Sequence, residues 1–383
     1  MAYDPTPTKP MFTSLQYCLR CGMPSAERDL TFDDMGICNI CQSSEQKMAI
    51  TWVEREKELR VILDQYRGRE GTEYDCIVPI SGGKDSAFQL YLITQVYKMK
   101  PLAVTFSHNW YSETGMRNLR WCLETFDCDH IMFTPSRSLV NRAARHSLGM
   151  IGDSCWHCHA GIGAFPLQIA VKYNIPLLIW GESVAEHSGM SNYNTIIKFD
   201  REYFKYVSSR FEHWEMATDY LSVRDLSPFA LPGWEEVEKL GLVGIHLGDH
   251  VFWDGERQVE LLRDLYGWRE EVVEGTYKCY KSVECIMPGV HDYTKFLKRG
   301  YGRATDHASQ DCRTGLMTRE EANEYIRAHD PKRPAILEYY LKSTGYTEEE
   351  FYRIMDRQRE ATGVISREEI EAALADHQAR FGG

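Results

Sequence analysis

The chain has 383 residues, of which 43% are hydrophobic and 26% are charged, as expected of a folded globular protein. This length predicts two or three domains rather than one small core. Lys and Arg total 44 against 56 Asp and Glu, a net charge of −12, which argues against a nucleic-acid backbone as the main partner. No apolar run is long enough to span a bilayer and no secretory signal is visible, so a cytoplasmic location is expected.

Residues 1–45 contain two close pairs of cysteines. The pattern is C-x2-C, sixteen residues, then a second C-x2-C, with the cysteines at Cys18, Cys21, Cys38 and Cys41. This spacing is typical of a four-cysteine zinc site built from two knuckles. Four thiolates leave no open coordination position, so we expect a structural zinc module. Residues 46–70 are predicted to follow as a linking helix.

Residues 71–250 alternate between short apolar runs and helical patterns. The expected strands are 74–80, 101–106, 130–133, 176–182 and 244–253, and the expected helices between them are 85–99, 116–126, 138–150 and 161–174. Pro166 is expected in the first turn of the last of these helices. This alternation predicts an α/β fold, a parallel sheet with helices on both faces.

Residues 251–383 are predicted to be mainly helical. Three segments open with a Ser/Thr-x-x-Glu capping box, at Thr318–Glu321, Thr347–Glu350 and Ser366–Glu369. Basic residues gather in one part of this otherwise acidic chain; they are Lys295, Lys298, Arg299, Arg303, Arg313 and Arg319. Asp306 and His307 lie among them, so this region is a candidate for substrate binding or acid–base catalysis, although a solvated basic helix face is the alternative for the lysines.

The stretch "SGGKDS" joins the first expected strand to the following helix. Its residues are Ser81, Gly82, Gly83, Lys84, Asp85 and Ser86. Backbone N–H groups at such a helix N-terminus, the lysine and the hydroxyl groups favour a phosphate, and the aspartate would cap the helix or help to bind a metal. The stretch does not match the G-x-x-x-x-G-K-[ST] pattern. An ordinary glycine-rich turn is the alternative.

Loops after parallel strands usually build the ligand site of such folds. The candidates after the fourth strand are Gly181, Glu182 and Glu186, and those after the second strand are Asn109, Thr114 and Asn118. A solvated acidic loop, or turn and capping residues, is the alternative. Cys76, Cys122, Cys128 and Cys312 are expected to be buried apolar residues.

The "SGGKDS" loop resembles the pyrophosphate-binding loop of the PP-loop ATP pyrophosphatases. Together with "CLRCGMP", "GICNIC", "CWHCH", "WGE", "YGRATDHASQD" and "GLMTREEA", it makes most of the chain similar to the N-acetyl sugar amidotransferases of bacterial surface-glycan biosynthesis. Cys312 stands where an aliphatic residue is expected. The resemblance implies the PP-loop fold, also called adenine nucleotide alpha-hydrolase-like, and the use of ATP and Mg²⁺.

The resemblance further implies adenylation of the acetamido group of a nucleotide-linked N-acetyl sugar, followed by displacement of AMP by ammonia to give an acetamidino sugar. Residues 81–86 would bind pyrophosphate, with Gly181 and Glu182 beside them. Lys84, Asp85, Arg303, Asp306 and His307 would be the catalytic or substrate-binding residues. Because the chain has no recognisable glutaminase motif, ammonia would come from a glutaminase subunit, with a cyclase-like channel subunit as a further partner.

Two alternatives remain open. Some PP-loop thiolases hold an iron–sulfur cluster with a C-x2-C pair and a third, distant cysteine. Here Cys155 and Cys158, flanked by His157 and His159, would pair with Cys279 or Cys285 in such a second metal site, and the protein would be a tRNA or small-molecule thiolase. A packed, inert cysteine pair is the simpler interpretation. The other alternative is a non-catalytic scaffold that binds partners through its zinc module.

Overall fold

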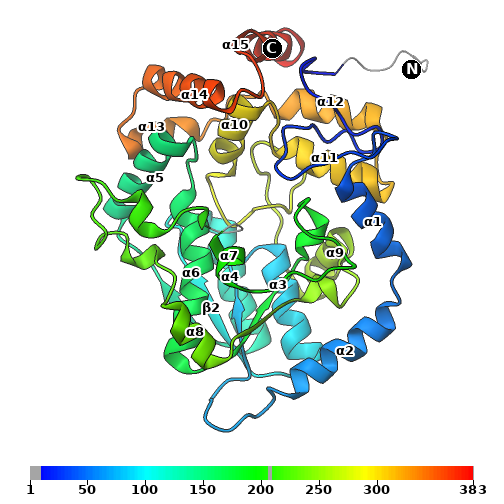
Figure 1. The fold of residues 1–383 in the computed structure, drawn as a ribbon, viewed down its shortest axis with the longest axis vertical. Coiled ribbons are helices and arrows are strands. Elements are labelled where there is room, and N and C mark those ends of the chain that lie inside the picture. The colour runs from blue at the N-terminus through cyan, green and yellow to red at the C-terminus, as the bar shows by residue number, and fades with distance from the viewer. Residues whose placement is uncertain (1–9, 206–208, 383) are drawn as a thin grey trace.

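A five-stranded parallel sheet lies at the centre of the computed structural model, which describes residues 10–205 and 209–382 (Figure 1). The strands are β1 (Cys76–Pro79), β2 (Pro101–Phe106), β3 (Asp129–Phe133), β4 (Leu177–Trp180) and β5 (Val243–His246), in the order β3-β2-β1-β4-β5. All neighbouring pairs are parallel. The sheet order reverses between β1 and β4, and such a switch point is where ligands usually bind.

Helices cover both faces of this sheet. One face carries α3 (Lys84–Tyr91), α4 (Glu113–Phe126) and α9 (Gly255–Tyr266), and the other carries α5 (Arg137–Ile151), α6 (Trp156–Tyr173) and α8 (Trp234–Leu240). Successive residues of β1 point to opposite faces, so Val78 packs with Leu90 of α3 whereas Ile77 packs with Leu167 of α6. The predicted α/β architecture is therefore confirmed.

Several expected elements differ from the structure. The expected helix over 85–99 is α3 followed by a π-helical turn at Leu92–Val96, and the expected strand over 244–253 ends at His246. The single linking helix over 46–70 is wrong, because α1 (Asn39–Ala49) ends at an extended Ile50 and α2 (Trp52–Asp64) starts anew. Helix α6 begins at Trp156 rather than 161, so Pro166 lies inside the helix and not in its first turn. The proline removes one helical hydrogen bond at a point where α6 borders a cavity.

The N-terminal module is fastened to the sheet region by α1. Cys38 caps this helix, so the second cysteine pair, Cys38 and Cys41, also forms the start of α1. Near its end, the Lys47 ammonium lies 2.5 Å from Glu186 and donates to the Trp253 carbonyl at 2.6 Å. The zinc module was predicted to begin at residue 1, and residues 1–9 lie outside the described part of the chain.

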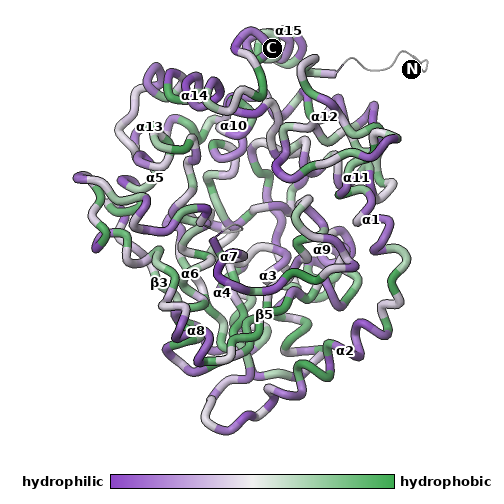
Figure 2. Tube along the Cα trace, viewed as in Figure 1, coloured by the Kyte–Doolittle hydropathy of each residue, from purple (hydrophilic) through white to green (hydrophobic). Residues whose placement is uncertain are grey.

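The C-terminal helices form a second layer above the carboxyl ends of the strands (Figure 1). They are α10 (Pro288–Arg299), α11 (Arg303–Thr314), α12 (Arg319–His329), α13 (Leu337–Thr344), α14 (Glu348–Thr362) and α15 (Arg367–Phe381). All three expected capping boxes are present, at α12, α14 and α15. Along these helices hydrophilic residues, in purple, mix with hydrophobic ones, in green, whereas the trace around β5 of the sheet is mainly green (Figure 2).

None of the helices in the described ranges is both long enough and apolar enough to cross a membrane.

Candidate active site

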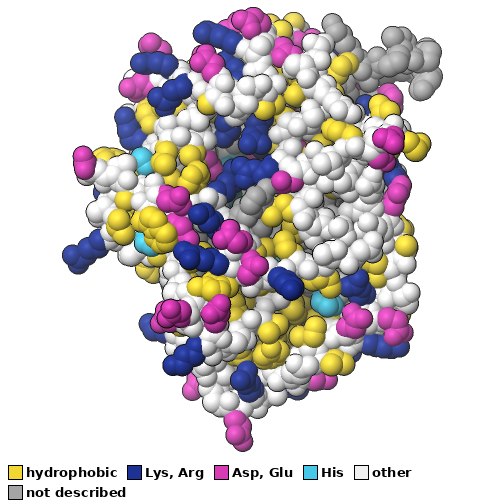
Figure 3. Space-filling model, viewed as in Figure 1, with side chains coloured by type: hydrophobic (Ala, Val, Ile, Leu, Met, Phe, Trp, Pro, Cys, Tyr) yellow, Lys and Arg dark blue, Asp and Glu magenta, His cyan; other side chains and the backbone are white. Residues whose placement is uncertain are grey.

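A cavity of about 780 Å³ separates the sheet from the C-terminal layer. It is lined by residues of the 81–86 loop, the start of α6, the loop after β4, and helices α10 and α11. Lys and Arg side chains surround a hollow near the middle of the face shown in Figure 3. The switch point of the sheet, the glycine-rich loop and the basic C-terminal motif thus meet in one space.

The 81–86 loop leads from β1 into the first turn of α3, which begins at Lys84. Gly83 is the N-cap, and Gly82 has a φ of +88°, where a Cβ would also lie 2.5 Å from the Gly115 carbonyl oxygen. The loop is braced internally, since the Ser81 amide donates to Ser86 Oγ at 3.2 Å and the Ser86 hydroxyl donates to the Gly83 carbonyl at 3.0 Å. Gly82 is required for this close approach to α4, a reason that the sequence pattern does not reveal.

Lys84 places a positive charge at the start of α3. Its side chain is only 2% exposed and pairs with Asp85, whose carboxylate also accepts a hydrogen bond from Trp253 Nε1 at 3.1 Å. Burial alone would lower the pKa of Lys84, but the carboxylates of Asp85 and Glu182 outweigh it and raise the pKa. Lys84 is therefore charged at neutral pH, as anion binding requires.

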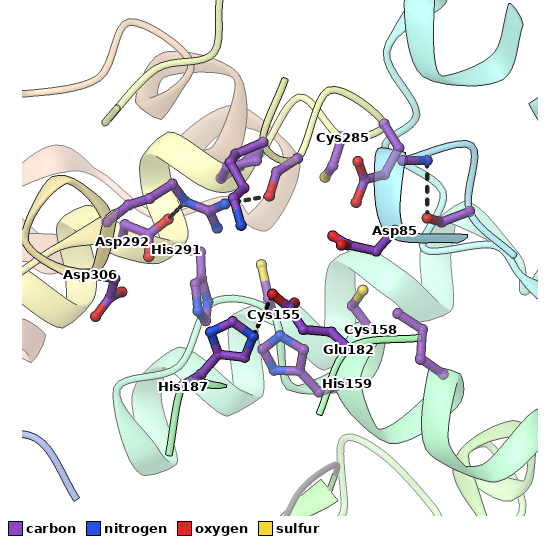
Figure 4. A pocket seen from close by; sticks show the side chains of 18 of the residues that line it. Asp85, Cys155, Cys158, His159, Glu182, His187, Cys285, His291, Asp292 and Asp306 are labelled. Atoms are coloured by element: carbon purple, nitrogen blue, oxygen red, sulfur yellow. Dashed lines mark hydrogen bonds and ion pairs between the residues drawn. The ribbon is translucent and has the colours of Figure 1, made fainter. Parts of the chain in front are cut away.

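Glu182 borders the same cavity from the loop after β4. It lies 2.7 Å from His187 Nε2 (Figure 4). Burial would raise the pKa of Glu182, but His187 and Lys281 outweigh it and hold this pKa well below its usual value. Gly181 also borders the cavity, where a Cβ would lie 3.1 Å from the Trp253 ring. Carboxylates of this kind, with substrate phosphates, are the ligands that Mg²⁺ prefers, so Asp85 and Glu182 fit this ion.

The C-terminal motif faces the loop from α11. Arg303 Nε lies 2.5 Å from Asp292 of α10, and Asp306 lies 2.5 Å from Lys295. His307 shares a hydrogen bond of 2.7 Å with Thr276, and its pKa is held well below the usual value by burial and nearby cations. Arg303, Asp306 and His307 therefore line the cavity, with His307 neutral at physiological pH.

The start of α11 is held by a carboxylate distant in sequence. Asp330 accepts hydrogen bonds from the amides of Gly302 (2.8 Å), Ala304 (2.9 Å) and Thr305 (3.3 Å), and from the Thr305 hydroxyl (2.6 Å). The side chain is buried, which raises its pKa to about 6. Asp330 thus fixes the helix end that carries Arg303 and His307.

The structure brings together three of the four cysteines expected to form a second metal site. Cys155, Cys158 and Cys285 border the cavity and approach the same space from two segments (Figure 4), whereas Cys279 is exposed and does not border it. Cys155 precedes α6 and Cys158 lies in its first turn. His159 and His291 lie beside them, with ring centroids 5.1 Å apart. His157 points away, buried edge-on against Trp110.

The N-terminal cysteines form the tighter cluster. Their sulfur atoms all lie within 4.8 Å of one another and are buried, which fits a tetrahedral metal ion such as zinc. In the described ranges, this is the only group of three or more such ligands at that spacing. The module also borders the cavity through Glu27 and Arg28, and the Tyr301 hydroxyl bonds to Glu27.

Several other predicted site residues have structural positions instead. Glu186 binds Lys47, and Asn118 bonds to the backbone of Arg269 in both directions. None of the following borders the cavity: Glu186, Asn109, Thr114, Asn118 and Arg319. Of the expected core cysteines, Cys76 and Cys122 are buried, and Cys128 and Cys312 are half-buried.

Sequence reasoning missed several charged residues that line the cavity, among them Asp153, His291, Asp292, Lys281 and Glu284, of which the last two lie closest in sequence to the expected cysteines. Lys281 and Glu284 lie in the irregular segment before α10, where no spacing or motif signals a ligand site. Their only sequence signal is a charged pair in a stretch between two cysteines, which is too common to be informative.

Comparison with known proteins adds an independent observation. Residues 274–373 match the model of the C-terminal domain of LPS biosynthesis proteins like WbpG. The chain carries a WbpG-like C-terminal domain. This match supports the expected resemblance to proteins of bacterial surface-glycan biosynthesis, and the WbpG-like domain contains the cavity-lining residues of α10 and α11.

Two further similarities are more limited. An uncharacterized protein of Methanocaldococcus jannaschii, MJ1599, is 29% identical over 89 residues, which is 23% of this chain and 31% of that protein. The chain thus spans less than a third of the length of that relative. The structure of NMN synthetase from Francisella tularensis aligns with 50% of this chain and 93% of its own, at 12% identity and a TM-score of 0.25.

Proposed function

We propose that this protein is an ATP-dependent amidotransferase of lipopolysaccharide O-antigen or related surface-glycan biosynthesis. It converts the acetamido group of a nucleotide-linked N-acetyl sugar into an acetamidino group and releases AMP and pyrophosphate. The cytoplasm, where ATP is available, is the proposed location.

One observation carries this proposal. The glycine-rich loop with its buried, charged Lys84 borders the same cavity as Arg303, Asp306 and His307 of the WbpG-like domain. A helix N-terminus with a lysine suits the pyrophosphate end of ATP. The cations and hydrogen-bonding groups of α11 suit a second polar substrate on the opposite wall.

In the proposed first step, the amide oxygen of the sugar attacks the α-phosphorus of ATP. The bond from this phosphorus to the bridging oxygen breaks, and pyrophosphate leaves an O-adenylated imidate behind. Ammonia then adds to the imidate carbon, the carbon–oxygen bond to AMP breaks, and a proton is lost. Amide, ATP and ammonia thus give amidine, AMP and pyrophosphate, and the former amide oxygen leaves as a phosphate oxygen of AMP.

The residues have separate parts in these steps. The amides of the loop and Lys84 stabilise the charge that develops on the departing pyrophosphate. Asp85 and Glu182 would hold Mg²⁺, which supplies charge neutralisation on the phosphates when bound. Arg303 and Asp306 orient the sugar, and neutral His307 is available to accept a proton from the attacking nitrogen.

Ammonia is proposed to come from a separate glutaminase subunit, with a cyclase-like channel subunit as a further partner. The sequence contains no glutaminase nucleophile motif of its own. Free ammonium in the assay replaces this partner.

The test is an AMP-release assay with Mg²⁺, ammonium and a panel of nucleotide-linked N-acetyl sugars. The expected product is lighter than the sugar by about one mass unit, since =O becomes =NH, and one AMP forms for each product. Lys84→Ala should abolish AMP release, whereas exposed Lys332→Ala should not change it. Absence of sugar-dependent AMP across the panel would refute the proposal.

A second candidate function is a thiolase with an iron–sulfur site, favoured by the position of Cys155, Cys158 and Cys285 on the same cavity as the loop. Cys279 provides a matched control, because it is exposed and lies outside this cavity. Protein purified without oxygen should then be brown and contain iron, and Cys285→Ser but not Cys279→Ser should remove both. Colourless protein with zinc alone would exclude this function.

A further inference from the structure

The segment 276–287 begins the WbpG-like domain but lies across the glycine-rich loop; we call it the crossing segment. It is fastened to the sheet region by an antiparallel bridge between Tyr111 and Cys285. The Ser112 amide donates to the Glu284 carbonyl at 3.1 Å, and the Ile286 amide donates to the Trp110 carbonyl at 2.9 Å. The crossing segment therefore has a defined position over the start of α4, and Cys285 in Figure 4 marks where it passes the cavity.

The contact is too close to admit side chains on the glycines beneath it. A Cβ at Gly115 would lie 2.3 Å from Glu284 Cα, and a Cβ at Gly83 would lie 2.8 Å from Glu284 Oε2. Gly83 of the loop is therefore needed for the close packing of the crossing segment, in addition to the close approach of a ligand. As a result, the crossing segment forms the roof of the site that surrounds the loop.

Lys281 of the crossing segment extends this roof with a positive charge. It borders the same cavity as Lys84 and Glu182, and the charges of both residues act on its pKa. Burial and the charge of Lys84 lower the pKa of Lys281. Two neighbouring ammonium groups in a partly buried place repel each other until an anion lies between them.

The other lysines of the cavity already have partners. Lys84 pairs with Asp85, Lys295 pairs with Asp306, and Lys298 donates to the carbonyl oxygens of Ile151 and Gly152. Within residues 10–205 and 209–382, Lys281 has no carboxylate oxygen within 4.0 Å of its ammonium. The carboxylates of Glu182 and Asp85 favour the charged form of Lys281, but neither forms an ion pair with it.

We propose that Lys281 binds the pyrophosphate portion of ATP together with Lys84, so that the WbpG-like domain completes the nucleotide site. This inference rests on the proposed function, because that function assigns the loop to ATP. The two ammonium groups bind oxygens of the same pyrophosphate portion. As the bond to the α-phosphorus breaks, both stabilise the charge that accumulates on the leaving group.

The experiment measures binding by calorimetry, with Mg-ATP, magnesium pyrophosphate and AMP as separate ligands and without any sugar. We expect Lys281→Ala to weaken the binding of ATP and of pyrophosphate by about 10- to 100-fold, which corresponds to about 1.4–2.7 kcal/mol. AMP lacks the phosphates concerned, so its affinity should change less than threefold. Lys281→Arg should recover part of the loss, and Lys332→Ala should behave as the wild type.

The three ligands distinguish failure of the inference about Lys281 from failure of the proposed function. Unchanged ATP and pyrophosphate affinity in a folded Lys281→Ala variant would overturn the inference alone. An equal loss for AMP would also overturn it, since the lysine would then act on the structure of the whole site. If the wild-type protein binds neither ATP nor pyrophosphate, both the inference and the proposed function are overturned. Because no sugar is present, failure to amidate any sugar leaves this result unaffected.

Discussion

Replacing Asp330 by alanine tests whether a residue outside the cavity positions α11, the helix that carries Arg303 and His307. The carboxylate accepts four hydrogen bonds at the N-terminus of α11, three from backbone amides and one from the Thr305 hydroxyl. Each such bond contributes about 1–1.5 kcal/mol, which gives a gross loss of about 4–6 kcal/mol. Alanine would also leave three amide groups without a partner at a buried helix end.

The buried charge opposes this stabilisation. Burial raises the pKa of Asp330 from 3.8 to about 6, so ionisation of the folded protein costs about 3 kcal/mol at neutral pH. The net loss in Asp330→Ala at pH 7 is therefore expected to be about 2 kcal/mol. Because this pKa is raised, the carboxyl group contributes most below its unfolded pKa, and this contribution disappears as the pH rises through about 6.

Native-state hydrogen exchange of the peptide covering α11 measures this directly. At pH 7 its protection should fall by about 30-fold in Asp330→Ala, which is about 2 kcal/mol. At pH 4.5 the loss should be about 2 kcal/mol greater, since the wild-type group is then largely protonated only in the folded state. The kcat/KM for the sugar should fall as well, because Arg303 and His307 lie on this helix.

Thr347→Ala is the matched control, because Thr347 caps α14 and lies outside the cavity. It should cost about 1 kcal/mol in α14 and leave α11 and the kinetics unchanged. Equal exchange of α11 in wild type and Asp330→Ala at both pH values would refute the reasoning.

Three further predictions concern other parts of the molecule. Removal of the metal expected at the N-terminal cysteines, by chelation or by Cys21→Ser, should abolish activity, because Glu27 of the same module borders the cavity; full activity in protein shown by mass spectrometry to be metal-free would contradict this. Gly161→Ala should lower the free energy of unfolding by about 1–3 kcal/mol in urea titrations, since a Cβ there would lie 2.1 Å from the Phe106 ring; an unchanged midpoint would show that the ring moves aside freely. His307 is held neutral by burial and nearby cations, which lower its pKa, so the pH profile of kcat/KM between pH 6 and 8 should keep its shape in His307→Gln while its height falls.

Local patterns were predictable from the sequence because their physics is local. The two cysteine pairs gather four sulfur atoms within 4.8 Å, and the three capping boxes close as their spacing requires. Each depends on atoms a few residues apart, or on ligand chemistry that permits few geometries. The alternating apolar runs likewise predicted the parallel sheet, because buried strands and amphipathic helices have different periods.

Patterns that depended on distant neighbours were less informative. The beginning of α6 was placed too late because "CWHCHAG" has no helical apolar period of its own, yet it forms the first turn beneath the cavity. Asn118 and Glu186 had the composition of ligand-site residues but bind Arg269 and Lys47 instead. In both cases a partner far away in the sequence decided the role of the side chain.

The sequence by itself thus determined the four-cysteine cluster, the position of the glycine-rich loop between a strand and a helix, and the class of fold, since these follow from short-range spacing and periodicity. The tertiary structure decided which distant groups share the loop's cavity. It brought Lys281 into the same cavity as Lys84, and Cys285 rather than Cys279, because the crossing segment packs against Gly115 of α4 and Gly83 of the loop, where no side chain fits. Such contacts depend on the packing of two layers against each other, and no local pattern in either layer encodes them.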